Sequence, residues 1–81
     1  MRMLDADEQA EVYTFQLYLT PSEAKELITE LEKLLKDPEA NEHFHVGLDT
    51  GRDFSCSLIT DNKMKDISGY TQLEQKILKK R

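Results

Sequence analysis

The clearest pattern near the start of the chain is an alternation of side-chain types over residues 11–20. From residue 13 onward, one set of alternate positions is apolar: Tyr13, Phe15, Leu17 and Leu19. An alternation of this kind, rich in aromatic residues, is typical of a β-strand with one buried face. The pattern therefore predicts a first strand over residues 11–20, and the aperiodic residues 1–10 before it predict a flexible lead-in.

A helix is predicted to begin directly after this strand. Residues 20–23 form a capping box with proline at the first helical position, in which the Thr20 hydroxyl accepts a hydrogen bond from the Glu23 N–H. Apolar residues then recur at helical spacing: Ala24, Leu27, Ile28, Leu31, Leu34 and Leu35. We expect this stripe to be buried and the charged remainder to face solvent. Pro38 disfavours helical geometry in the residue before it, so the helix is expected to end there.

Two further alternating runs, residues 43–49 and 53–61, flank a turn that contains Gly51. A three-residue loop over residues 49–51 would give these cross-strand pairs: Phe44 with Cys56, Val46 with Phe54, and Leu48 with Arg52. The apolar side chains of both strands would then share one face, whereas a two-residue loop would put them on opposite faces. We therefore predict a hairpin with the three-residue loop and with Gly51 in the left-handed conformation.

The end of the chain predicts a second, shorter helix, because residues 71–74 repeat the capping pattern before another apolar stripe. The order of elements is therefore strand, helix, strand, strand, helix. A helical crossover leaves the first two strands parallel, so the third can insert between them and pair antiparallel with both. This predicts an α+β fold (β-α-β-β-α) as one domain over residues 11–81. Its mixed three-stranded sheet has the order 1-3-2, a split β-α-β or ferredoxin-like half, with both helices on one face.

His43 and His45 lie on one face of a predicted strand, which is a common way for a sheet to present two metal ligands. Their cross-strand neighbours in the predicted register are Ser57 and Ser55, which are poor ligands, and no acid or thiol is expected in reach. Cys56 projects from the opposite side of the sheet, which argues against a Cys–His nucleophile. We therefore predict no metal site, no cofactor and no catalytic residues.

The outer face of the predicted sheet is open if both helices cover the inner face. Its mixture of aromatic, imidazole, aliphatic and small polar side chains is compatible with a protein interface and equally with a hydrated sheet surface. The candidate interface residues are Thr14, Gln16, Tyr18, His43, His45, Ser55, Ser57 and Ile59. The neighbours Ser55 and His45 have no evident third group or oxyanion donors, so we expect no enzymatic activity.

The 81-residue chain is acidic, with 16 Asp plus Glu against 11 Lys plus Arg and a formal net charge of -5. An acidic body repels nucleic acids and membrane surfaces and attracts basic partners. We therefore expect a protein partner, and neither nucleic acid nor a membrane. No run approaches the roughly 18 to 20 apolar residues of a membrane span. The early acidic residues do not fit an export signal, and we therefore expect a cytoplasmic protein.

Four stretches of the chain resemble a group of short bacterial proteins: LTPSEAKEL at 19–27, LLKDPEANEHFH at 34–45, the strand at 54–60, and GYT at 69–71. The group is that of predicted immunity proteins of polymorphic toxin systems, the class called immunity protein thirty-two, and the likeness covers residues 17–78. Such a family implies a non-catalytic inhibitor that binds and occludes a cognate toxin, and the acidic body fits a basic toxin. The alternative is a self-associating structural or regulatory domain, a homodimer through a sheet edge or the open sheet face.

Overall fold

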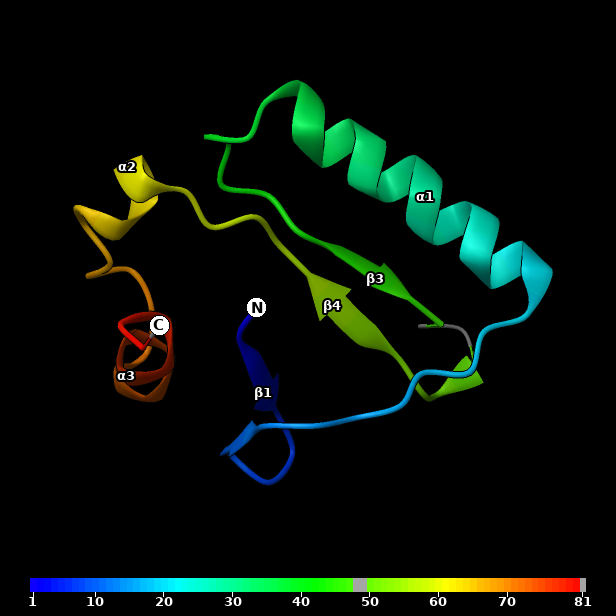
Figure 1. Cartoon of the computed structure of the whole chain (residues 1–81), viewed down its shortest axis with the longest axis horizontal. Helices are drawn as coiled ribbons and strands as arrows, with labels where there is room; N and C mark the ends of the chain where they lie inside the picture. The colour runs from blue at the N-terminus through cyan, green and yellow to red at the C-terminus, as the bar shows by residue number, and fades with distance from the viewer. Residues whose placement is uncertain (48–49, 81) are drawn as a thin grey trace. The chain divides into compact units, whose positions relative to one another are not determined.

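The structure is a computed structural model that describes residues 1–47 and 50–80 (Figure 1). The chain divides into two compact units. One, here called the helix–hairpin unit, is Tyr18–Thr60, and the other, here called the terminal unit, is Met1–Leu17 together with Asp61–Arg81. Both units contain helices and antiparallel strands or turns, so the predicted α+β class is confirmed. The single domain predicted over residues 11–81 stays a prediction.

Helix α1 (Pro21–Lys36) begins where the capping box predicts it. The Glu23 N–H donates to the Thr20 hydroxyl at 3.1 Å, and the Thr20 N–H donates to the Glu23 carboxylate at 2.9 Å. The helix ends before Asp37, whose N–H donates to the Leu34 carbonyl. Local capping chemistry therefore sets both ends of this helix.

Strands β3 (Phe44–Val46) and β4 (Phe54–Cys56) form an antiparallel hairpin beside α1 (Figure 1). The observed pairs confirm the predicted register: Phe44 with Cys56, His45 with Ser55, and Val46 with Phe54. Gly51 has a φ of +78°, as the turn prediction requires. The predicted pairing of Leu48 with Arg52, and Asp49 in the predicted loop, lie outside the described residues.

The core of the helix–hairpin unit lies between α1 and the hairpin. Leu34, Phe44 and Val46 are buried, and other side chains pack around them: Leu27, Leu31, Phe54, Cys56 and Leu58. Ile28 and Leu35, which we predicted on the buried stripe, are exposed instead. The reason is geometric, because a hairpin of two strands covers a narrower strip of a helix than the three-stranded sheet we expected.

The predicted three-stranded sheet of order 1-3-2 is wrong, because the described residues form two separate two-stranded sheets. Of the predicted first strand, only its start lies in a strand, β2 (Ala10–Val12), which pairs antiparallel with β1 (Met3–Asp5). The turn between them is held by the Asp5 carboxylate, which accepts from the N–H groups of Asp7 and Glu8, both at 3.0 Å. A turn this local closes with little loss of chain entropy, which favours it over a distant pairing with β4.

This first hairpin occupies most of the segment that we predicted as a lead-in without regular structure. The terminal unit also contains α2 (Asp61–Met64) and α3 (Gln72–Leu78), with Ile67 and Ile77 buried. The second capping box is confirmed. The Glu74 N–H donates to the Thr71 hydroxyl at 3.2 Å, and the Glu74 carboxylate accepts from the Thr71 N–H. Helix α3 contacts β1, and α1 contacts β3, so the two helices do not share one sheet.

Among the described residues, no helix is long and apolar enough to cross a membrane.

Gly47 is a second special glycine of the β3–β4 turn, and sequence reasoning missed it. Its φ is +82°, and a Cβ atom at this position would lie 2.4 Å from the Arg52 carbonyl oxygen. The Thr50 hydroxyl lies 2.7 Å from the Gly47 carbonyl oxygen and 3.2 Å from that of Arg52. The turn therefore brings two stretches of backbone so close together that only glycine fits between them.

We predict that Gly47→Ala destabilises the protein more than Gly51→Ala. Positive φ alone costs a residue with a Cβ about 1 to 2 kcal/mol, which is the effect expected at Gly51, where a Cβ meets no atom within 4 Å. At Gly47 the collision with Arg52 adds to that cost. Urea unfolding followed by circular dichroism measures both, with Gly69→Ala as the control, since a Cβ there also meets nothing within 4 Å. Equal losses at positions 47 and 51 would contradict this description of the turn.

Candidate functional site

The outward face of the β3–β4 hairpin is polar, and it holds half of the eight candidate interface residues. Side chains alternate along a strand, so burial of Phe44 and Val46 against α1 directs His45 outward. Ser55, its cross-strand partner, is exposed in the same way. We call this surface the hairpin polar face, and it comprises His43, His45, Asp53, Ser55 and Ser57.

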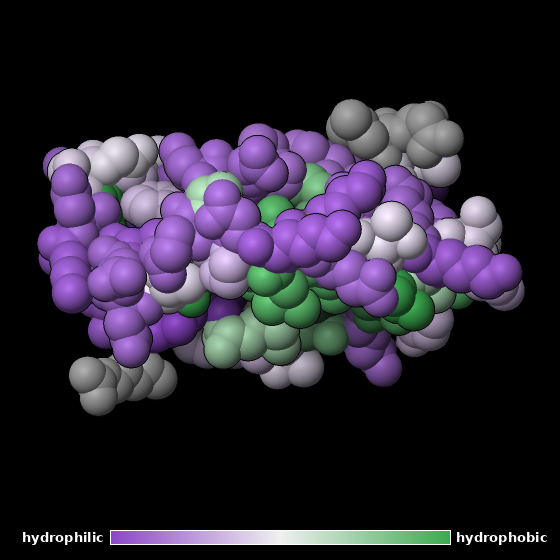
Figure 2. All heavy atoms as spheres, turned by 90° about the horizontal axis from the view of Figure 1, so that it is seen from above, coloured by the Kyte–Doolittle hydropathy of each residue, from purple (hydrophilic) through white to green (hydrophobic). Residues whose placement is uncertain are grey.

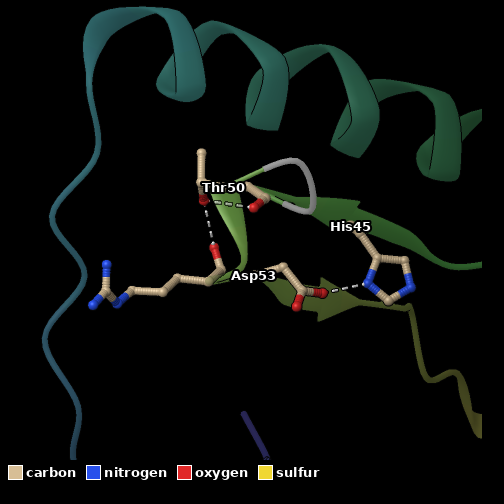
Figure 3. Close-up of polar contacts among 5 residues, drawn as sticks. His45, Thr50 and Asp53 are labelled. Atoms are coloured by element: carbon tan, nitrogen blue, oxygen red, sulfur yellow. Dashed lines mark hydrogen bonds and ion pairs between the residues drawn. The ribbon is translucent and has the colours of Figure 1, made fainter.

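A hydrogen-bonded contact between His45 and Asp53 is the main polar contact of this face (Figure 3). His45 Nδ1 lies 2.7 Å from Asp53 Oδ2, with the two side chains 37% and 34% exposed. Asp53 lies two residues before Ser55 on the same side of the hairpin, so it is the diagonal neighbour of His45. Our expectation that no acid lies within reach of the histidines is therefore wrong. The predicted register already makes Asp53 a diagonal neighbour of His45, and this relation was the signal in the sequence.

The two histidine rings lie next to each other, which agrees with the prediction that they share one face. Their centroids are 5.1 Å apart, and the ring planes meet at 77° in an edge-to-face arrangement. Among residues 1–47 and 50–80, no group of three or more His, Cys, Asp or Glu side chains is placed to hold a metal ion. One copy of the chain therefore brings two imidazoles together, with a carboxylate behind one of them.

The combination of Asp53, His45 and Ser55 contains the residue types of a hydrolase triad, but not its geometry. The carboxylate orients His45 as such a triad requires. In the described contacts, however, no hydrogen bond joins the side chains of Ser55 and His45, and both residues lie on an exposed sheet face. Burial raises the pKa of the Cys56 thiol, which disfavours its reactive thiolate form. The absence of enzymatic activity stays a prediction.

The other predicted interface residues do not join this face as one sheet. Thr14, Gln16 and Tyr18 are exposed, but they lie outside any strand, and Ile59 is half-buried. Since the expected strand does not pair with β4, the continuous outer sheet face that we predicted is not formed. The hairpin polar face is the part of it that the structure brings together.

A second exposed surface lies just after β2, in the terminal unit, and it contains three side chains of the predicted inner row of a strand. The exposed fractions are 78% for Tyr13, 51% for Phe15 and 45% for Leu17. Residues 12–20 also contain no charged side chain, although 33% of the whole chain is charged. Exposed apolar side chains also occur on α1, at Ile28 and Leu35, and Figure 2 shows a mainly hydrophilic face with some apolar residues, in green, at its surface. We call residues 13–17, which all belong to the terminal unit, the aromatic segment.

The basic end of the chain is tied to the first hairpin within the terminal unit. The Arg2 guanidinium donates twice to the Lys80 carbonyl, at 3.1 and 2.8 Å, and the Lys80 ammonium donates to the Glu11 carboxylate. Tyr13 also donates to Glu11, at 3.1 Å. The hydrogen bond from Lys80 is the main reason that the pKa of Glu11 is lowered, and it raises the pKa of Lys80. Lys80 therefore has a structural partner, which sequence reasoning did not identify.

Comparison with known proteins adds no relative: no family model, no curated protein and no solved structure matches this chain. The resemblance to immunity proteins stays a prediction from the sequence.

We predict that Lys80→Gln raises the pKa of Glu11 toward the ordinary glutamate value. At pH values above the ordinary glutamate pKa, the Glu11–Lys80 pair stabilises the fold. This contribution is lost as the pH falls through the lower pKa that Glu11 has in the folded state. The stability difference between wild type and variant should therefore shrink on acidification. A carboxyl-carbon NMR titration measures the pKa, with Lys79→Gln as the control. A Glu11 pKa equal in wild type and Lys80→Gln would contradict the pairing.

Proposed function

We propose that this chain is a non-catalytic protein-binding module that neutralises a toxin by covering part of its surface. The observation that carries the binding role is the aromatic segment, residues 13–17, which exposes aromatic and leucine side chains in a stretch without charge. Cores of protein interfaces are enriched in aromatic residues and depleted of charged ones. The resemblance of residues 17–78 to predicted immunity proteins supplies the toxin as the partner.

The negative charge of the chain supports a basic partner. This charge is distributed unevenly between the two units. The helix–hairpin unit carries nine Asp plus Glu and four Lys plus Arg, whereas the terminal unit carries seven of each. The net charge of -5 therefore belongs to the helix–hairpin unit. An acidic unit speeds encounter with a basic protein, while an uncharged segment supplies the contacts that exclude water afterwards.

A second candidate function is self-association, and the strand edges favour it. In the described part of the chain, β3 and β4 pair only with each other, and so do β1 and β2. Each hairpin therefore has unpaired backbone N–H and C=O groups along its outer edges, which a second copy can pair with. The mass of the metal-free protein in solution, measured at rising concentration, distinguishes this candidate from a monomeric inhibitor.

Co-expression with the product of the gene immediately upstream tests the toxin-neutralising proposal. We expect that product to stop growth of a bacterial host and the chain to restore growth. The double variant Phe15→Glu/Leu17→Glu should restore growth poorly and bind the purified toxin at least about tenfold more weakly, because it places charge in the contact segment.

The matched control is Thr29→Glu, which adds a charge at an exposed position of α1. It should protect as well as wild type, and circular dichroism melting should show all variants folded. A harmless upstream product, or a toxin that the wild-type chain does not counter, would overturn the toxin assignment. Full protection by the double variant would show that the aromatic segment is not part of the toxin-binding interface.

A further inference from the structure

The hairpin polar face contains two exposed imidazole rings that lie close enough together for one metal ion to reach both. His43 and His45 come from alternate positions at one end of the hairpin, and their ring centroids are 5.1 Å apart. Two imidazoles that bind one tetrahedral Zn²⁺ through nitrogens at about 2.0 to 2.1 Å have ring centres about 5 Å apart. The observed separation is therefore compatible with two ligands of one zinc ion, provided that the exposed rings turn so that a nitrogen of each points to the metal.

Asp53 provides the support that zinc-binding histidines usually have. Its carboxylate lies 2.7 Å from His45 Nδ1 (Figure 3). With Nδ1 donating to this carboxylate, Nε2 of the same ring carries the free lone pair and can bind a metal. A carboxylate behind a ligating histidine fixes its ring orientation and increases its basicity. Our sequence-based prediction of no metal site rested partly on the absence of an acid in reach, and this contact shows that one of its premises is wrong.

One chain supplies only part of a complete site. Within the described residues, no further His, Cys, Asp or Glu is placed to form a metal-binding cluster with His43 and His45. A tetrahedral zinc site takes four ligands. The face is exposed, so a second copy can approach it. A two-fold axis through the metal would bring an identical pair of histidines, and isologous contacts of this kind are the commonest in homodimers.

We propose that His43 and His45 form half of a zinc site, which the same two histidines of a second copy complete. One Zn²⁺ then links two chains, with Asp53 of each chain orienting His45 from behind. The two Asp53 carboxylates also balance the charge of a site that has only neutral imidazole ligands. The cation reduces the repulsion between two chains that each carry a net charge of -5. This dimer does not depend on the toxin-neutralising proposal, since it uses neither the aromatic segment nor a foreign partner.

The test is a titration of the full, chelator-treated chain with zinc chloride, followed by calorimetry and by size-exclusion chromatography with light scattering. We expect one zinc ion to bind per two chains and the mass to double, with reversal on addition of EDTA. His43→Gln and His45→Gln should each abolish the zinc-dependent dimer. Asp53→Asn should weaken zinc binding about 10- to 100-fold, the range typical of a lost carboxylate behind a ligating histidine.

Glu42→Gln is the matched control, because it removes one carboxylate beside His43 as Asp53→Asn does beside His45, and Glu42 is exposed. It should leave zinc affinity within about twofold of wild type. Circular dichroism spectra of the metal-free variants check that each is folded. Cobalt substitution adds a second readout, since tetrahedral Co²⁺ has a strong visible absorption.

Four results would overturn the proposal. These are absence of zinc binding, zinc binding that survives loss of both histidines, one zinc ion per monomer without a change in mass, and a dimer that forms equally in EDTA. The last result would favour pairing through the strand edges instead. Failure of the growth test has no bearing on these outcomes, because none of them involves a toxin.

Discussion

The antiparallel pairing of β3 with β4 is the constraint on which the helix–hairpin unit depends. Because side chains alternate along a strand, the pairing of Phe44 with Cys56 and of Val46 with Phe54 puts the apolar side chains of both strands against α1. The same pairing puts His45 opposite Ser55 and makes Asp53 its diagonal neighbour. A slip of one residue would bury the histidine and expose the phenylalanine. Core and candidate site therefore follow from one register.

The features that the sequence predicts correctly are all local. Both capping boxes depend on residues three positions apart, and the register follows from the parity of two neighbouring runs around a glycine turn. Gly51 has the expected positive φ for the same reason. Each of these interactions closes a short loop, so few alternatives compete with it.

The features that sequence reasoning missed depend on partners distant in the sequence or diagonal in the sheet. An alternating pattern tells which side chains of residues 11–20 share a face, but not which strand they pair with, and the turn held by Asp5 decides that choice. The exposure of Ile28 and Leu35 follows from the narrow sheet that results. Asp53 and His45 are diagonal neighbours in the predicted register, and side chains of such neighbours can reach each other as those of directly opposed residues do.

The two candidate surfaces differ in chemistry, and this difference separates the two proposals. The aromatic segment has apolar area and no charge, which suits a protein partner, whereas the hairpin polar face has imidazoles and a carboxylate, which suit a cation. The negative charge of the helix–hairpin unit favours a basic protein in the first case and a metal cation in the second. Of the two surfaces, only the hairpin polar face owes its geometry to the β3–β4 register.

A nuclear Overhauser spectrum of the isotopically labelled chain tests this register most directly. We expect backbone proton contacts that join His45 to Ser55, together with side-chain contacts from Phe44 and Val46 to Leu34. Backbone contacts that place His45 opposite Phe54 or Cys56, with its ring protons against Leu34, would contradict both the core and the site described above.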